Sequence, residues 1–113
     1  MTTRAMLASA IGRIGRDLSA PAVVRRAEAG APAHELWAAI VDSGLDRALV
    51  PASAGGAGLA WRDLLPLVQA CGEHAMPVPL AETLGAHALA NAAGMAIPEG
   101  SASFARLRSQ RAG

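Results

Sequence analysis

Residues 50 to 61 read VPASAGGAGLAW, in which three glycines fall within four positions, shortly before a tryptophan and a helical pattern. Glycine-rich stretches can cradle phosphate groups, or they can turn a tight corner between helices. A phosphate-binding loop needs a lysine and a hydroxyl after its final glycine, whereas Gly58 is followed by Leu59 and Ala60. A dinucleotide fingerprint needs a small residue where Trp61 stands, and a surrounding βαβ unit. The stretch therefore predicts a corner between two helices.

Proline and glycine divide the rest of the chain into blocks of helical length, with hardly any alternating β-branched stretch between them. Residues 3–18 carry apolar side chains at spacings of three and four, which predicts an amphipathic helix. Ser19 followed by Pro21 is a helix start signal, in which the serine caps a second helix that runs to Ala29.

A third helix is expected between Pro32 and the cap at Gly44, and a fourth follows the glycine stretch with Pro66 in its first turn. A fifth should run from about Leu80 to Ala93. It is apolar around most of its girth, so it needs cover on two sides. The apolar edge of the third helix comprises Leu36, Trp37, Ile40 and Val41, and that of the fourth Trp61, Leu64, Leu65, Val68 and Cys71.

The fold expected is therefore all-α, a small bundle of about five helices over residues 1–100, followed by a polar, basic and disordered tail over 101–113. A chain of 113 residues that is 52% apolar can form one domain with a real core, but hardly two. The longest uncharged stretch, residues 83–98, is too short to span a bilayer. The N-terminal residues do not form a convincing signal peptide.

The net charge of +1 is unevenly distributed, with arginines concentrated at both ends and most acidic residues in the middle. Nucleic-acid binding is not expected, because two tryptophans and one phenylalanine are too few to interleave a basic face. The single cysteine, Cys71, cannot form an internal disulfide, and we read it as a small buried residue in a cytoplasmic protein. The pair His34-Glu35 lacks the second histidine of a zinc helix, so no metal is expected.

A family resemblance rests on the order of these segments over about residues 34–100. An apolar helix ends in Gly44-Leu45, and Leu49-Val50-Pro51, Gly55-Gly56-Ala57-Gly58-Leu59, a helix ending in Gly72 and a PVPL segment follow. This order resembles the N-terminal helical domain of acyl-CoA dehydrogenases. Ala52, Ser53 and Ala54 depart from the pattern, since family members often carry acidic residues and an aromatic there.

The resemblance implies one wall of the acyl-CoA pocket of an FAD-dependent dehydrogenase of fatty acid or lipid metabolism. It also implies that the catalytic glutamate and most of the flavin site belong to a β domain and a C-terminal domain that this chain lacks. We therefore expect no catalytic residue here and no catalysis by the chain alone. Its expected partners are an acyl-CoA and either a larger acyl-CoA dehydrogenase chain or a second copy of itself.

The candidate pocket lining lies on the last helix, where Leu80, Thr83, Leu84 and His87 share one face. Each has an ordinary structural alternative: the leucines can be plain core, and Thr83 can bond back to a carbonyl of its own helix. His87 has no acidic or histidine partner at helical spacing, which favours packing over acid–base or metal chemistry. The alternative for the whole chain is a free-standing helical module that binds another protein, because a fold does not dictate a function.

Overall fold

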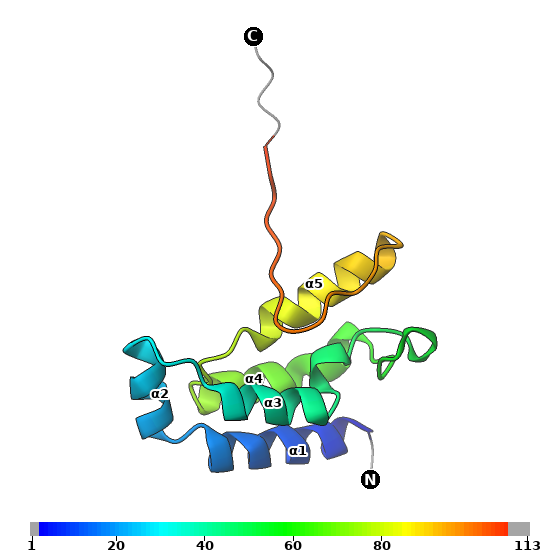
Figure 1. The fold of residues 1–113 in the computed structure, drawn as a ribbon. Helices are drawn as coiled ribbons and strands as arrows, with labels where there is room; N and C mark the ends of the chain where they lie inside the picture. Colours follow the sequence, from blue (N-terminus) through cyan, green and yellow to red (C-terminus); the bar gives the residue numbers. More distant parts are fainter. Residues whose placement is uncertain (1–2, 109–113) are drawn as a thin grey trace.

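The computed structural model describes residues 3–108, with side chains from residue 4 onward. Within this part of the chain there are α-helices and short 3-10 helices but no strand, which confirms the predicted all-α bundle of five helices (Figure 1). None of the described helices is long and apolar enough to cross a membrane. The α-helices are α1 (Thr3–Leu18), α2 (Pro21–Glu28), α3 (His34–Asp42), α4 (Leu65–Glu73) and α5 (Leu80–Ala92), and the 3-10 helices are η1 (Leu45–Arg47), η2 (Ala52–Ala54) and η3 (Trp61–Leu64).

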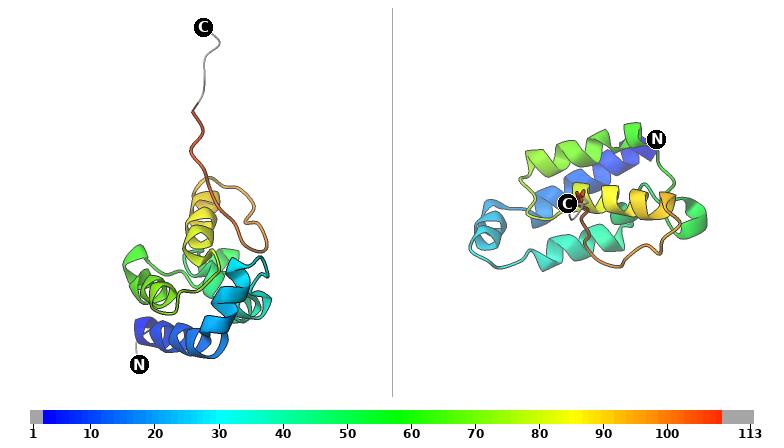
Figure 2. Two further views of the ribbon diagram at one scale, coloured as in Figure 1. Left: turned by 90° about the vertical axis from the view of Figure 1, so that its left-hand side faces the viewer. Right: turned by 90° about the horizontal axis from the view of Figure 1, so that it is seen from above.

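The helices lie in three layers, with α1 on one side, α3 and α4 side by side in the middle, and α5 on the other side (Figures 1 and 2). Helix α1 packs most extensively on α4 and next on α3, whereas α5 packs mainly on η1. Apolar side chains from every layer meet in one core, because each amphipathic helix must cover its apolar face. The largest buried apolar side chains are Ile11, Leu36, Ile40, Leu67, Leu80 and Leu84.

The close approach of α1 to the end of α4 depends on Gly15, which is buried in α1. A Cβ atom at this position would collide with the ring of His74 and would come within 2.8 Å of the Met76 terminal methyl. Ser19, at the end of α1, reinforces this contact because its hydroxyl donates a hydrogen bond to the His74 carbonyl at 3.0 Å. Glycine and serine thus let two helices distant in sequence touch.

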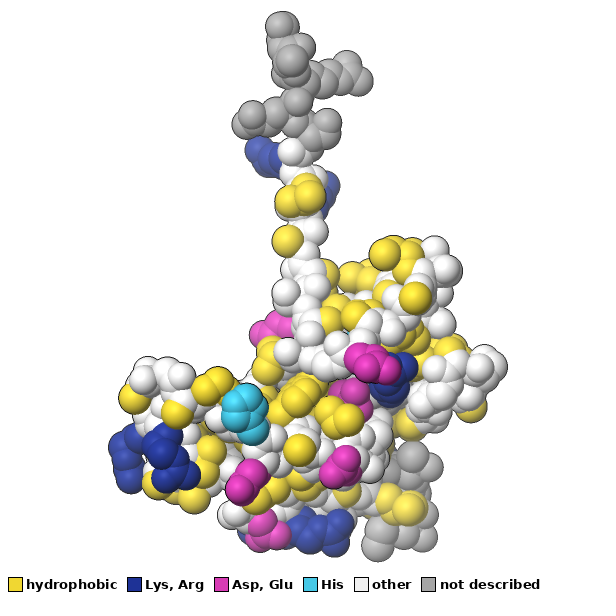
Figure 3. Space-filling view, viewed as in Figure 1, with side chains coloured by type: hydrophobic (Ala, Val, Ile, Leu, Met, Phe, Trp, Pro, Cys, Tyr) yellow, Lys and Arg dark blue, Asp and Glu magenta, His cyan; other side chains and the backbone are white. Residues whose placement is uncertain are grey.

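The predicted cap of α2 was wrong in one residue. Ala20, in extended conformation, holds the N-cap position, and Pro21 begins the helix. Ser19 lies one residue too early, and its hydroxyl is already engaged with the end of α4. The basic last turn of α2 carries Arg25 and Arg26 at one end of the molecule, away from the acidic side chains that lie over the middle of the face seen in Figure 3.

Helix α3 ends at the predicted glycine cap but begins at His34 and not at Pro32, and its apolar edge is only partly buried. Leu36 and Ile40 are buried, whereas Trp37 is half-buried and Val41 is 41% exposed. The core of this small bundle buries only part of the apolar edge that these four residues form. Gly44 ends the helix in the left-handed region, with φ of +73°, as a C-terminal glycine cap does.

The glycine stretch forms the predicted corner between η1 and η3. Gly55 and Gly58 have positive φ angles, of +86° and +66°, which glycine adopts without strain. Gly56 has a different role, because a Cβ atom there would collide with the backbone carbonyl of Val50. The corner therefore uses two glycines for backbone direction and one for close approach.

Candidate functional site

The amides of the glycine corner are occupied by the corner itself. Six successive N–H groups, from Ala54 to Leu59, donate to backbone carbonyls of residues 47–52. The next amide, of Ala60, donates to the Asp63 carboxylate at 3.3 Å. A phosphate cradle needs amides that point outward and lack internal acceptors. The corner therefore has a structural role, in agreement with the sequence pattern.

The four residues predicted as pocket lining all lie in the interior beside α5. Leu80, Thr83, Leu84 and His87 are each no more than 2% exposed. Leu80 and Leu84 belong to the main core cluster. Leu84 also borders an open groove, described below, and is the one member of the four that does so. Their role in binding an acyl group remains a prediction.

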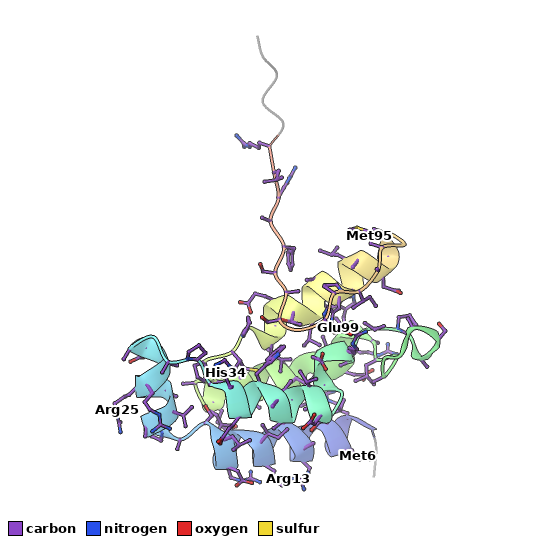
Figure 4. All side chains as sticks on the ribbon, viewed as in Figure 1. Met6, Arg13, Arg25, His34, Met95 and Glu99 are labelled. Atoms are coloured by element: carbon purple, nitrogen blue, oxygen red, sulfur yellow. The ribbon has the colours of Figure 1, made fainter. Side chains whose placement is uncertain are left out.

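Thr83 is paired with the segment that follows α5. Its hydroxyl donates to the Ala102 carbonyl at 3.2 Å and accepts from the Ala102 amide at 3.0 Å. The alternative of a bond back to its own helix is therefore wrong. Residues 95–104 run back along α5 on the side that faces α3 (Figures 1 and 2), and Met95 and Glu99 mark the beginning of this path in Figure 4.

His87 is fully buried, and its ring links α5 to η1. Its Nδ1 lies 3.0 Å from the Asp46 carbonyl oxygen. Because a carbonyl can only accept, Nδ1 donates the proton in this hydrogen bond. Nε2 has no hydrogen-bond partner among the described residues. The structure thus gives His87 a packing role with one unpaired ring nitrogen in the interior.

The main apolar hollow at the surface is a groove between α4 and α5, which we call the α4–α5 groove. Its volume is about 590 Å³, within the range of small-molecule sites. Two arginines, Arg4 and Arg62, are the polar members of its lining, and the rest is apolar. The lining consists of Arg4, Trp61, Arg62, Leu64, Leu65, Val68, Ala81 and Leu84.

Large apolar side chains remain in contact with solvent in this groove. Trp61 is 66% exposed, Leu65 49% and Val68 48%. Leu64 at the end of η3, and Leu67 and Ala70 on α4, are buried against the core. Helix α4 therefore has two apolar faces. The sequence pattern predicts a single apolar edge made of Trp61, Leu64, Leu65, Val68 and Cys71, because helical spacing alone does not say which face is covered.

Two smaller hollows have more polar linings. One, of about 350 Å³, lies where α1, α2 and α3 meet and includes Asp17, Arg26, His34 and Glu35. The other, of about 430 Å³, lies between α2 and the end of α4. Across the described part of the chain, no three His, Cys, Asp or Glu side chains gather closely enough to hold a metal ion.

Cys71 lies on α4 and is half-buried. Burial, reinforced by the charge of Glu82, raises the pKa of its thiol above the ordinary value of 9.0. A thiol of this kind is largely protonated at neutral pH, whereas catalytic cysteines have lowered pKa values. The geometry therefore supports the prediction of a structural cysteine.

Comparison with known protein families, with curated proteins and with solved structures finds no match for this chain. The functional interpretation therefore rests on the order of the sequence segments and on the groove.

Proposed function

We propose that this chain is an acyl-CoA dehydrogenase N-terminal-like domain, in a cytoplasmic setting, and that its α4–α5 groove forms one wall of an acyl-CoA pocket. The observation that carries this proposal is the groove itself, which presents exposed Trp61, Leu65 and Val68 beside two arginines. Apolar side chains favour a hydrocarbon tail, and guanidinium groups at the same hollow favour an anionic ligand. An acyl-CoA combines both features.

The resemblance supports the same assignment from a different direction. The segments that resemble the family extend from α3 to the end of α5, and the PVPL segment leads directly into α5, one wall of the groove. The contribution of the chain would be to hold the apolar tail and to exclude water from it. The proton and hydride transfers that the resemblance implies need a glutamate base and FAD supplied by other domains or another chain.

FAD does not fit the glycine corner, the one glycine-rich stretch of this chain that a pyrophosphate could have used. Amides 54–59 already donate to backbone carbonyls, so they have no donor left for phosphate oxygens. No step of the reaction is therefore assigned to a flavin bound by these residues. In this proposal the chain completes a pocket whose chemistry lies elsewhere.

The first experiment titrates the chain with octanoyl-CoA and with free CoA while recording tryptophan emission. We expect octanoyl-CoA to change the emission through Trp61 and free CoA to leave it nearly unchanged. Val68→Asp should weaken binding about tenfold by placing a carboxylate in the groove. Val41→Asp is the matched control, because Val41 is similarly exposed but lies on α3. Equal effects of both variants, or no response to octanoyl-CoA, would contradict the assignment.

The alternative is a helical module that binds an unrelated protein. Exposed apolar residues outside the groove favour it, namely Leu89 at 54% and Met95 at 65% exposure. A pull-down of the tagged chain from its native lysate separates the two. A yellow complex with a flavoprotein of acyl-CoA dehydrogenase type supports the proposal. A colourless complex that forms through Leu89 and Met95, and is lost when both become serine, supports the module.

A further inference from the structure

The segment after α5 occupies a site that is built into that helix. We call residues 101–104 the C-terminal strap. Thr83 pairs with both backbone groups of Ala102, so a single hydroxyl satisfies the donor and the acceptor of one strap residue. Two residues further on, the ring of Phe104 lies against Gly85, where an added Cβ would come within 2.8 Å of Cε1. The Thr83 hydroxyl therefore fits the backbone of Ala102, and the space left by Gly85 fits the ring of Phe104.

The strap also reaches the neighbouring layer. Ser101 lines a small cavity of about 210 Å³ together with residues at the start of α3 and in the turn before α5. Trp37 and Val78 belong to the same lining. The beginning of the strap thus lies close to both α5 and the start of α3.

Helix α5 is held to the bundle by its buried side chains, Leu80 and Leu84 among them, and by few polar contacts. It packs mainly on η1, and its one described side-chain hydrogen bond to the rest of the bundle is that of His87 to the Asp46 carbonyl. Two further residues of α5, Ala81 and Leu84, line the α4–α5 groove. The strap and the groove therefore share α5 as a common wall.

We propose that the C-terminal strap is a latch, docked on Thr83 and Gly85, that holds α5 in place and thereby sets the width of the α4–α5 groove. Docking is reversible, because two hydrogen bonds and a ring that remains 60% exposed hold the strap. Release would let α5 move as a unit, since locally weak attachments open first. The groove then binds apolar anions differently with the strap docked and released, a consequence that rests on the proposed function.

The test uses full-length variants and site-resolved amide exchange. Thr83→Val keeps the side-chain shape but removes both hydrogen bonds to Ala102. The Ala102 amide should then exchange about five- to tenfold faster, and the amides of α5 about threefold faster. Thr83→Ser retains the hydroxyl and should restore slow exchange at Ala102. Leu89→Ala, on an exposed position of α5, is the control and should change neither set.

The Ser19 amide is buried at the end of α1, donates to the Gly15 carbonyl and serves as the reference for opening of the whole bundle. Equal acceleration at Ser19 and Ala102 in Thr83→Val would overturn the latch, because Thr83 would then support the whole fold. Unchanged exchange at Ala102 would also overturn it. Gly85→Ala and Phe104→Ala provide independent release and should reproduce the faster exchange of the α5 amides.

The effect on the groove is measured with 1-anilinonaphthalene-8-sulfonate, an apolar anionic fluorophore. Its dissociation constant should change about threefold in Thr83→Val and remain unchanged in Thr83→Ser. Faster exchange at Ala102 without any change in α5 exchange or probe affinity would overturn the latch, since the strap would then be a passive cover. If the unmutated protein binds no probe, the groove proposal fails, while the exchange of the α5 amides still decides the latch.

Discussion

The glycine corner and the α4–α5 groove are neighbours in the sequence, yet they differ in how far their own residues satisfy one another. In the corner, successive amides find acceptors within the corner, and Gly56 packs directly on the Val50 backbone. In the groove, Trp61 and Leu65 remain in contact with water. Amides 54–59 of the corner are therefore hydrogen-bonded without any other molecule. The groove exposes a contiguous apolar surface of the kind that marks a binding site.

The largest effect on stability is expected for a substitution in the glycine corner. Gly56→Val places a branched side chain against the Val50 carbonyl, so the corner must open. We expect a loss of about 3 kcal/mol or more in unfolding free energy, which lowers the melting temperature by roughly 12 °C or more. Thermal unfolding followed by circular dichroism measures this. Ala57→Val, at the exposed next position, is the control, and an unchanged melting temperature in Gly56→Val would show that the corner is not closely packed.

A second pair of variants compares a buried and an exposed leucine on the same helix. Leu67 is fully buried and Leu65 is 49% exposed, although both lie on α4. Leu67→Ala should cost about 3 kcal/mol through lost burial and a cavity, and Leu65→Ala less than about 0.5 kcal/mol. Urea unfolding of both variants measures the difference. Equal losses would mean that the groove face of α4 is covered in solution.

A smaller effect is expected at the joint between α1 and the end of α4. Ser19→Ala removes the partly buried hydrogen bond to the His74 carbonyl and should cost about 1 kcal/mol. Ser43→Ala is the matched control, because the Ser43 hydroxyl bonds to Ala39 of its own helix at an exposed site. We expect it to change the unfolding free energy by less than about 0.5 kcal/mol. If Ser19→Ala lowers the unfolding free energy no more than the control does, the contact between α1 and the end of α4 does not contribute to stability.

The smallest effect concerns Cys71, on α4. Because burial raises its pKa above 9.0, alkylation by iodoacetamide should still accelerate as the pH rises past 9 in the folded protein. The stabilising contribution of this thiol is complete below the pKa of the unfolded chain. It is lost as the pH rises through the higher pKa of the folded state. A reaction rate that levels off at or below pH 9 would show that the thiol is not shielded.

Much of the bundle could be predicted because local signals specify it. Glycine caps such as Gly44 and the early proline of α4 set helix ends through backbone geometry, which the sequence displays directly. The covered faces were harder to predict, because Val41 and Val68 differ from core residues in their neighbours and not in their type. The same reason placed Ser19 at a cap that Ala20 holds, since its partner, the His74 carbonyl, is distant in sequence.

The candidate site was predicted only in part. Helical spacing correctly placed Leu80, Thr83, Leu84 and His87 on one side of α5, but of these four only Leu84 reaches the groove. Thr83 pairs with the C-terminal strap, a segment without any periodic pattern that could have announced the contact. Contacts between a helix and an irregular segment leave no repeating signal in a sequence. The hydrogen bonds between Thr83 and the Ala102 backbone are therefore visible in the structure but not in the sequence.

The hydrogen bonds of the glycine corner also bear on the order in which the chain folds. They join residues 47–50 to residues 57–59 and therefore close loops of about ten residues, a size that closes in roughly 10–100 ns. The contacts of Ser19 with His74 and of His87 with Asp46 span 55 and 41 residues. Closing such long loops carries a larger entropic cost. We therefore expect the corner to form before the layers assemble and to act as an early guide that directs α4 and α5 back onto α1 and α3.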